Sequence, residues 1–418
     1  MHTSKHRRSS RLQTLIDRVP ERLRTPLLLG VATIVGIGLI ASPGLLAIGA
    51  ANEPASISTA SLNVVRRTMP EIVPPARQKE HRSDVVGFYV NWDDTSYRSL
   101  ARNIDKMTML MPEWYHLNNA GHVSVDSPKQ QARAMKLVRS RGKHLKVMPI
   151  VNNFDAPAVQ RLLHSPKARR TMAREIVRAM RANHFDGVNI DFEGLPASSR
   201  HDLIAFMRVL APLAHRNGLV VSQDVIVGSP TYDHRNLARS ADFLVPMMYD
   251  EHWKTSGPGP IASQRWFKGA LKKFLRQVPP NKVVLALGTY GYDWSLRGGR
   301  ASSLTYAQAR AISRKHKTPL KLDPGSLNAT LKYGYGARAR RAWVLDSVST
   351  FNQVKTGTRH GVRGFAIWRL GAEDPAMWQV MANRDDLNRK TALSLRGPHR
   401  ALSYDETSGL ITREYVKP

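Results

Sequence analysis

The sequence predicts an α/β fold, a (β/α)8 TIM barrel over roughly residues 84–382, from three observations. From Asp84 onward, short apolar runs alternate with amphipathic stretches of helical period. Several of these runs are almost continuously apolar, as expected of parallel strands covered on both faces. Eight runs fall within about 300 residues, a usual length for such a barrel. A doubly wound open sheet is the alternative, but no glycine-rich phosphate loop follows the first run.

The elements are expected to alternate along the chain. The strands are expected at residues 85–90, 107–116, 145–151, 187–192, 219–225, 243–249, 283–288 and 363–368. Helices are expected at residues 129–141, 157–183, 198–217, 263–278 and 305–315. Residues 383–418 are a polar C-terminal extension, in which residues 404–416 are expected to form a hairpin around Ser408 and Gly409.

Three segments precede the expected barrel. Residues 1–24 are basic, residues 25–51 carry no charged side chain, and residues 52–83 form a proline-containing polar linker. The uncharged segment is long enough to cross a bilayer at about 1.5 Å per residue. The basic flank predicts that residues 1–24 stay in a bacterial cytoplasm, with the barrel outside the inner membrane. Small residues at 47–50 leave cleavage and secretion as the alternative.

The composition limits the classes of partner. The 418 residues carry a net charge of +31 and contain no cysteine. The charge predicts attraction to polyanions such as anionic lipid or acidic cell-wall polymers, although a generally basic surface explains it equally well. Nucleic acid ranks last, because no zinc-finger spacing, RNA-binding aromatic pattern or Walker loop is present. Without cysteine there is no disulfide, thiolate nucleophile or cysteine-ligated zinc, and we expect neither a metal nor a cofactor.

Residues 185–194 place four polar side chains on one otherwise apolar strand: Asp186, Asn189, Asp191 and Glu193. Because strand side chains alternate, the last three share one face, about 6.6 Å apart. In a barrel that face is the interior, where carboxylates are costly unless hydrogen-bonded or functional. Neighbouring like charges raise one pKa, as a general acid near neutral pH requires. The pattern predicts an active site, and solvated acids at a strand end are the alternative.

The segment Asp-Gly-Val-Asn-Ile-Asp-Phe-Glu, residues 186–193, resembles the Asp-Gly-x-Asp-x-Asp-x-Glu signature of family 18 glycoside hydrolases, the chitinase-like barrels. Residues 247–253 and 364–368, on the expected sixth and eighth strands, agree with it. Residues 249–267 are similar to the spore-cortex-lytic branch and to barrels fused to deacetylase and glycosyltransferase modules of bacterial polysaccharide synthases. The resemblance covers about residues 84–381 and implies a separate synthase or deacetylase as a partner.

The resemblance implies substrate-assisted retaining catalysis. Glu193 would protonate the leaving oxygen and later act as base on water. The substrate's own 2-acetamido carbonyl would attack the anomeric carbon, and Asp191 would orient that group. Tyr249 would hydrogen-bond the acetamido oxygen, Trp368 would form the apolar floor beneath the sugar, and Asp250 would hold a sugar hydroxyl.

Further residues are expected to line the substrate cleft. Trp92 follows the first strand, where a barrel loop meets substrate. Gln223 and Asp224 end the fifth strand. Asp186 and Asn189 are expected to bind substrate with the rest of the signature strand.

One residue departs from the signature, because Asn189 stands where the family has its second aspartate. Asparagine can hydrogen-bond Asp191 but cannot share a charge or accept a proton. We therefore expect less upward pressure on the pKa values of Asp191 and Glu193.

The expected function is a membrane-anchored hydrolase of β-linked N-acetylglucosamine polysaccharide, which could be peptidoglycan, an exopolysaccharide or a chitin-like chain. The main alternative is a non-catalytic glycan-binding barrel that serves a cell wall or a polysaccharide synthase. The presence of both Asp191 and Glu193 favours the enzyme, because a binding protein needs no poised acid. Nucleic-acid binding is a third class that depends on charge alone.

Overall fold

The computed structural model describes residues 83–395 and 400–416. The expected membrane anchor, residues 25–51, and nearly all of the linker lie outside these ranges. Within them, no helix is both long enough and apolar enough to cross a membrane.

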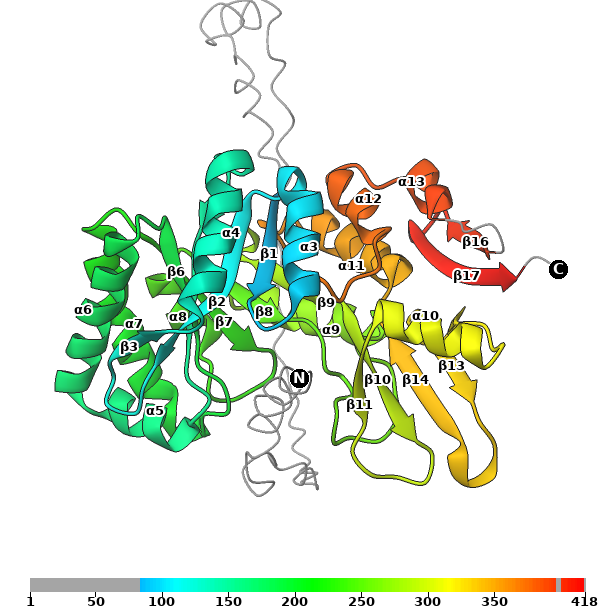
Figure 1. The fold of residues 1–418 in the computed structure, drawn as a ribbon, viewed down its shortest axis with the longest axis horizontal. Helices are drawn as coiled ribbons and strands as arrows, with labels where there is room; N and C mark the ends of the chain where they lie inside the picture. Colours follow the sequence, from blue (N-terminus) through cyan, green and yellow to red (C-terminus); the bar gives the residue numbers. More distant parts are fainter. Residues whose placement is uncertain (1–82, 396–399, 417–418) are drawn as a thin grey trace, which may run out of the picture. The chain divides into compact units, whose positions relative to one another are not determined.

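Eight strand positions form a closed parallel barrel, which confirms all eight predicted strands (Figure 1). Strand β1 pairs with both β2 and β15, so the sheet closes and the open-sheet alternative is wrong. The barrel strands are β1 (Asp84–Val90), β2 (Met109–Leu117), β4 (Lys146–Val147) with β5 (Ile150–Asn152), β6 (Gly187–Asp191), β7 (Val220–Ile226), β8 (Phe243–Met247), β9 (Val284–Gly288) and β15 (Gly364–Trp368). A short strand, β3 (Val123–Val125), pairs antiparallel with the end of β2.

The third barrel strand is split into β4 and β5 because Pro149 has no N–H to donate to its neighbour. The barrel nevertheless continues through the break. Met148 donates its backbone N–H to Leu110 at 2.9 Å, and the carbonyl of Pro149 accepts from Asn189 at 3.0 Å.

Helices surround the barrel. One predicted helix is wrong because it is interrupted. The single helix expected at residues 157–183 is two helices, α5 (Ala156–His164) and α6 (Pro166–Ala182). Proline disfavours helical backbone at the residue before it, and Ser165 instead caps α6 by accepting from the N–H of Ala168. The other barrel helices are α3 (Asp94–Asn103), α4 (Pro128–Arg141), α7 (Arg200–His215), α8 (His234–Ser240), α9 (Gln264–Leu275), α11 (Ser347–Arg359) and α12 (Met377–Ala382).

A second sheet, which the sequence did not predict, is inserted after the carboxyl end of β9. Its antiparallel order is β11-β10-β14-β13-β12. The strands are β10 (Tyr290–Ser295), β11 (Ser302–Thr305), β12 (Lys321–Leu322), β13 (Ala329–Tyr333) and β14 (Arg340–Val344). The helix expected at residues 305–315 exists as α10 (Tyr306–Lys315), but it packs on this sheet and not on the barrel (Figure 1).

Two separate apolar cores hold the barrel. The larger lies between the strands and the surrounding helices. The smaller fills the barrel interior with alternate residues of the strands, among them Phe88, Met111, Ile150 and Phe243, and Tyr249 and Trp368 pack against it. This interior cluster is the floor beneath the carboxyl ends of the strands, where barrel enzymes place their chemistry.

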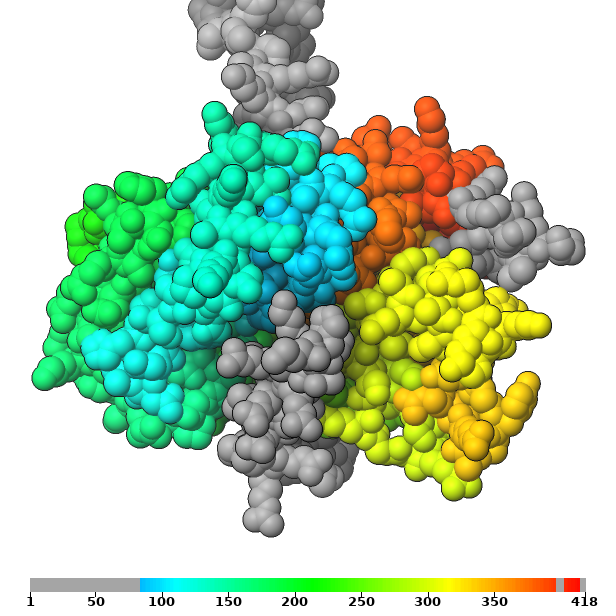
Figure 2. All heavy atoms as spheres, viewed as in Figure 1, coloured from blue at the N-terminus to red at the C-terminus, as the bar shows by residue number. Residues whose placement is uncertain are grey.

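The C-terminal hairpin is confirmed as β16 (Arg400–Asp405) and β17 (Leu410–Val416), with Gly409 at φ +63° in the turn. It is fastened to α11 by the buried Asn352. The Asn352 amide donates to the carbonyl of Ile411 at 2.8 Å and accepts from the N–H of Ile411 at 2.8 Å. In the space-filling view the orange segment lies beside the blue start of the described chain (Figure 2).

Replacing Asn352 by leucine is expected to lower the free energy of unfolding by about 2–6 kcal/mol. The change leaves both backbone groups of Ile411 buried without their partner, at about 1–3 kcal/mol each. Urea unfolding of the full-length chain measures the effect. The matched control is Asn183→Leu, which removes one exposed hydrogen bond to Ala179 and is expected to stay within about 0.5 kcal/mol. Equal losses in the two variants would show that the Asn352 hydrogen bonds do not fasten the hairpin.

Candidate active site

The predicted carboxylate strand delivers its side chains to the barrel interior as expected. Asn189 is fully buried and accepts from the hydroxyl of Ser222 on β7 at 2.7 Å. Asp191 is the last residue of β6 and is 5% exposed. Glu193 lies two residues beyond the strand end and is partly exposed. The three residues therefore run from the barrel interior to its mouth, with Glu193 outermost.

A further buried carboxylate, which sequence reasoning missed, comes from β2. Glu113 is 5% exposed and accepts from the side-chain amide of Asn152, at the end of β5, at 2.8 Å. Burial, with a smaller contribution from the charge of Glu193, raises the pKa of Glu113 to about 7. A lone glutamate inside the apolar run at residues 107–116 was the signal that could have identified it.

Asp224 of β7 completes a cluster of four carboxylates and is 5% exposed. Burial raises the pKa values of Asp191 and Asp224 well above the ordinary range of aspartate, and Glu193 and Glu113 raise both further. The Asn189 amide lowers the pKa of Asp224 in part, although Nδ2 makes no well-formed hydrogen bond to another described residue. The pKa of Asp191 is high even with Asn189 in place, because burial and the charges of Glu193, Asp224 and Glu113 all raise it.

Tyr249 and Trp368 lie at the ends of two other strands and face the same interior. Tyr249 follows β8, and burial raises its pKa well above the usual value, with Asp224 adding to the rise, so its hydroxyl remains protonated and able to donate. Trp368 ends β15 and packs edge-on against Phe88 with ring centroids 5.3 Å apart. The structure therefore brings the predicted tyrosine and tryptophan to the mouth of the barrel that holds the carboxylates.

Asp250 connects the barrel to the inserted sheet. It adopts φ +62° directly after Tyr249. Its carboxylate accepts from the hydroxyls of Tyr290 and Tyr292 on β10, the latter at 3.3 Å. Burial raises the pKa of Asp250 to about 6, against the lowering effect of these hydrogen bonds. The insertion therefore fixes one wall of the site.

Two predicted substrate-binding residues lie elsewhere. Asp186 precedes β6, at the opposite end from Asp191, and its carboxylate accepts from the N–H of Val147 at 2.7 Å. Asp242, which directly precedes β8, likewise accepts from the backbone N–H of Val221 on the neighbouring strand. Both aspartates therefore bind the backbone of an adjacent strand at the amino end of the barrel. Gln223 alternates with Ser222 and Asp224 and therefore points away from the interior. The geometry removes Asp186 and Gln223 from the site.

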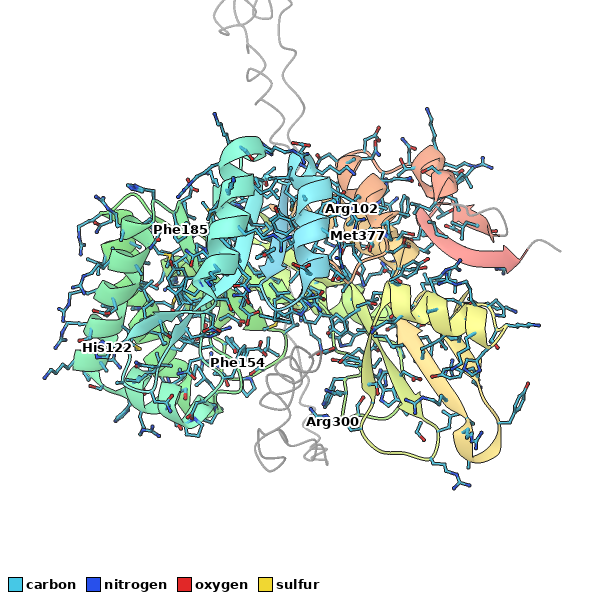
Figure 3. The ribbon with its side chains drawn as sticks, viewed as in Figure 1. Arg102, His122, Phe154, Phe185, Arg300 and Met377 are labelled. Carbon is cyan, nitrogen blue, oxygen red and sulfur yellow. The ribbon has the colours of Figure 1, made fainter. Side chains whose placement is uncertain are left out.

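Exposed aromatic side chains surround the carboxyl end of the barrel. The predicted Trp92, after β1, is 50% exposed, Phe154 after β5 is 50% exposed, and Trp253 after β8 is 44% exposed. Phe154 lies on the same side of the barrel as the insertion, where Arg300 is also labelled (Figure 3). Sequence reasoning missed Phe154, although an aromatic residue in the polar loop after a strand is a usable signal. Flat apolar rings at the ends of barrel strands suit stacking against sugar rings.

Among the described residues, no three His, Asp or Glu side chains are grouped so that they could hold a metal ion. The chemistry open to the described residues is acid–base and electrostatic: a partly exposed carboxyl at the mouth, buried carboxylates behind it, and a protonated tyrosine.

Comparisons with known proteins agree with this geometry. The chain is 22% identical over 311 residues to the uncharacterized glycosylase YvbX of Bacillus subtilis, covering 70% of this chain and 89% of the relative. It is 25% identical to the cortical fragment-lytic enzyme of the same organism, covering 59% of this chain and 61% of that protein.

Solved structures show the same fold. A chitinase from Chromobacterium violaceum matches with a TM-score of 0.68 at 23% identity, covering 73% of this chain and 100% of that one. The spore cortex-lytic enzyme SleL of Bacillus megaterium matches with a TM-score of 0.66 at 18% identity, covering 75% of this chain and 76% of that one. The model of the glycosyl hydrolases of family 18 matches residues 84–373, the whole barrel with its insertion, and on that match the chain belongs to family 18 of the glycosyl hydrolases.

Proposed function

We propose that this chain hydrolyses β-linked N-acetylglucosamine polysaccharide by substrate-assisted retaining catalysis, with Glu193 as the acid and then the base. The observation that carries the proposal is the depth order of the signature strand. Glu193 is partly exposed at the mouth, while Asp191 is 5% exposed directly behind it. A glycosidic oxygen can therefore reach Glu193, and a group attached to the same sugar can reach Asp191.

Each neighbouring group has a role that its environment supports. The protonated hydroxyl of Tyr249 is able to donate to the acetamido carbonyl oxygen. Asp191 orients the acetamido N–H, so that the carbonyl oxygen is aimed at the anomeric carbon. Trp368 gives the sugar an apolar surface at the end of β15. Asp250 holds a sugar hydroxyl while its carboxylate is fixed by Tyr290 and Tyr292.

The substrate class is a longer chain than one disaccharide. The exposed Trp92, Phe154 and Trp253 follow three different strands, so several sugars can stack around the cleft. The relatives, among them a cortical fragment-lytic enzyme and a chitinase, support peptidoglycan or another N-acetylglucosamine polymer. We further propose that residues 25–51 anchor the chain in a bacterial membrane with the barrel outside, and that a separate polysaccharide synthase or deacetylase acts on the same polymer.

Incubating the full-length chain with peptidoglycan, N-acetylglucosamine oligomers and fully deacetylated oligomers tests the proposal. We expect new reducing ends from the acetylated substrates and none from the deacetylated chains, which lack the attacking carbonyl. Cleavage of deacetylated oligomers would rule out acetamido participation.

A second candidate is a glycan-binding barrel without catalysis, and the departure at Asn189 favours it. It predicts saturable binding of the acetylated oligomers without any new reducing ends. Binding that weakens steeply with salt and shows no glycan preference would instead indicate a polyanion-binding surface.

A further inference from the structure

Asn189 leaves Asp191 without a proton-exchanging neighbour on its own strand. Its side-chain oxygen already accepts from Ser222 at 2.7 Å, and a carboxamide can neither gain nor lose a proton near neutral pH. Apart from Glu193, which is the proposed acid at the strand end, any group that exchanges a proton with Asp191 must come from another strand.

Asp224 lies beside Asp191 across the strand pair. In the parallel register of β6 and β7, Asn189 is opposite Ser222 and Ile190 is opposite Gln223, so the next residue of each strand, Asp191 and Asp224, meet at the end of the pair. Registered residues of adjacent strands point to the same face and lie about 4.8 Å apart. Asp191 and Asp224 therefore both enter the barrel interior as close neighbours.

Both carboxyls are buried and incompletely hydrogen-bonded. Each is 5% exposed, and Oδ1 of each has no hydrogen-bond partner among the described residues. Two carboxylates this close and this deeply buried cannot both be ionised, because desolvation and like-charge repulsion both favour a proton on one of them. One proton shared between the two relieves both penalties, as in other paired-carboxylate sites.

The groups that act on Asp224 include no cation that would keep it ionised. They are acidic or neutral: Asn189, Asp191 and Glu193 from β6 and its end, Glu113 from β2, and Tyr249 and Tyr232 from the loops after β8 and β7. Burial raises the pKa values of both aspartates well above the usual range, as a shared proton requires.

We propose that Asp224 is the proton-sharing partner of Asp191 and takes, from the neighbouring strand, the position that the family signature gives to residue 189. Asp224 is a positioning residue, since it acts through Asp191 and not on the sugar. In the resting enzyme one proton lies between the two carboxyls. As positive charge develops on the acetamido group, the proton moves to Asp224, which leaves Asp191 as the carboxylate facing that charge. The role rests on the proposed hydrolase function, but the shared proton does not.

Three variants of the full-length chain test the pairing: Asp224→Asn, Asn189→Asp, and the exchange Asn189→Asp/Asp224→Asn. For Asp224→Asn we expect kcat on an acetylated oligomer to fall roughly 10- to 100-fold, less than the loss for a group that itself transfers a proton to substrate. The acidic limb of the pH profile should move up by about one unit, because Asp191 without a partner takes up a proton at higher pH than the singly protonated pair takes up its second one. The exchange should recover most of the rate and bring the limb of the pH profile back to its original position, because it restores a carboxylate beside Asp191. Asn189→Asp alone should not move this limb up, because Asp191 keeps a carboxylate partner.

Asp242→Asn is the matched control, since Asp242 holds backbone at the amino end of the barrel. It is expected to leave the acidic limb in place even if it lowers the melting temperature. An unchanged limb in Asp224→Asn would overturn the proposal. A loss in Asp224→Asn that the exchange does not recover would also overturn it and make Asp224 a structural residue.

Thermal unfolding against pH decides the shared proton even if no substrate is cleaved. Carboxyls with raised pKa values bind more protons when folded than when unfolded, so stability falls as pH rises from about 4 through the raised values. Asp224→Asn should flatten that fall, and the exchange should restore it. An equal slope in the original chain and in Asp224→Asn would reject the shared proton, whereas failure to cleave any acetylated polymer would reject the hydrolase alone.

Discussion

Replacing Glu193 by glutamine is expected to lower kcat on acetylated oligomers by about 10³- to 10⁴-fold, the upper part of the range for a lost general acid. Glutamine has nearly the same shape and still donates a hydrogen bond, but it has no proton to give to the departing oxygen. KM should change little, because Glu193 is partly exposed at the mouth and the exposed aromatic rings remain in place. Initial rates of reducing-end release measure the effect.

The leaving group separates a lost acid from general damage to the site. An aryl glycoside whose phenol departs without protonation should lose far less activity in Glu193→Gln than a sugar oligomer does. The surface variant Glu175→Gln is the control, because its ion pair with Arg178 is exposed and such pairs contribute little. Glu193→Gln activity above a tenth of the original on the oligomer, or equal losses on both substrates, would contradict the assignment.

The barrel could be predicted because its strands are covered on both faces. Parallel strands packed between an interior core and a helix layer must be apolar throughout, and that composition is visible in the sequence. The inserted sheet gave no such signal. Its antiparallel strands carry charged residues at the surface or in ion pairs, so they are not apolar throughout. Strand β14 begins with Arg340 and Arg341, and Arg340 forms an ion pair with Asp293 of β10. Pro166 indicates the helix break at Ser165, but the prediction of one long amphipathic helix did not take this proline into account.

Within the site, the sequence predicts the contacts that depend on one strand alone but not those that depend on two strands. The shared face of Asn189, Asp191 and Glu193 follows from alternation along β6 alone. The pairing of Asp191 with Asp224 depends on the register between two strands, which the sequence of either strand does not determine. The alternation of side chains along a strand explains the error at Gln223. A shift of one residue along β7 reverses the face to which a side chain points, so Gln223 and Asp224 cannot both face the barrel interior. The error at Asp186 has another origin: the signature includes a residue that holds the barrel at the end opposite to its chemistry.

Replacing Asp191 by asparagine is expected to lower kcat by about 10²- to 10³-fold, the usual cost of losing one preorganised electrostatic contact at the charge that develops in the transition state. Asparagine can still hydrogen-bond the acetamido group, but it carries no negative charge opposite the positive charge that forms when the carbonyl attacks. The loss should appear in kcat more than in KM, because the ground-state substrate is neutral.

Asp186→Asn is the sharpest control for that loss, because it makes the same substitution at the other end of the same strand. Asp186 accepts from the N–H of Val147 outside the site, so its variant is expected to lower stability while kcat stays within about twofold, as no transition-state contact is removed. Equal losses of kcat in Asp186→Asn and Asp191→Asn would mean that the strand is needed only as a scaffold. A loss confined to Asp191→Asn, together with the requirement for an acetylated substrate, would place the nucleophile on the sugar and its orienting charge at the end of β6.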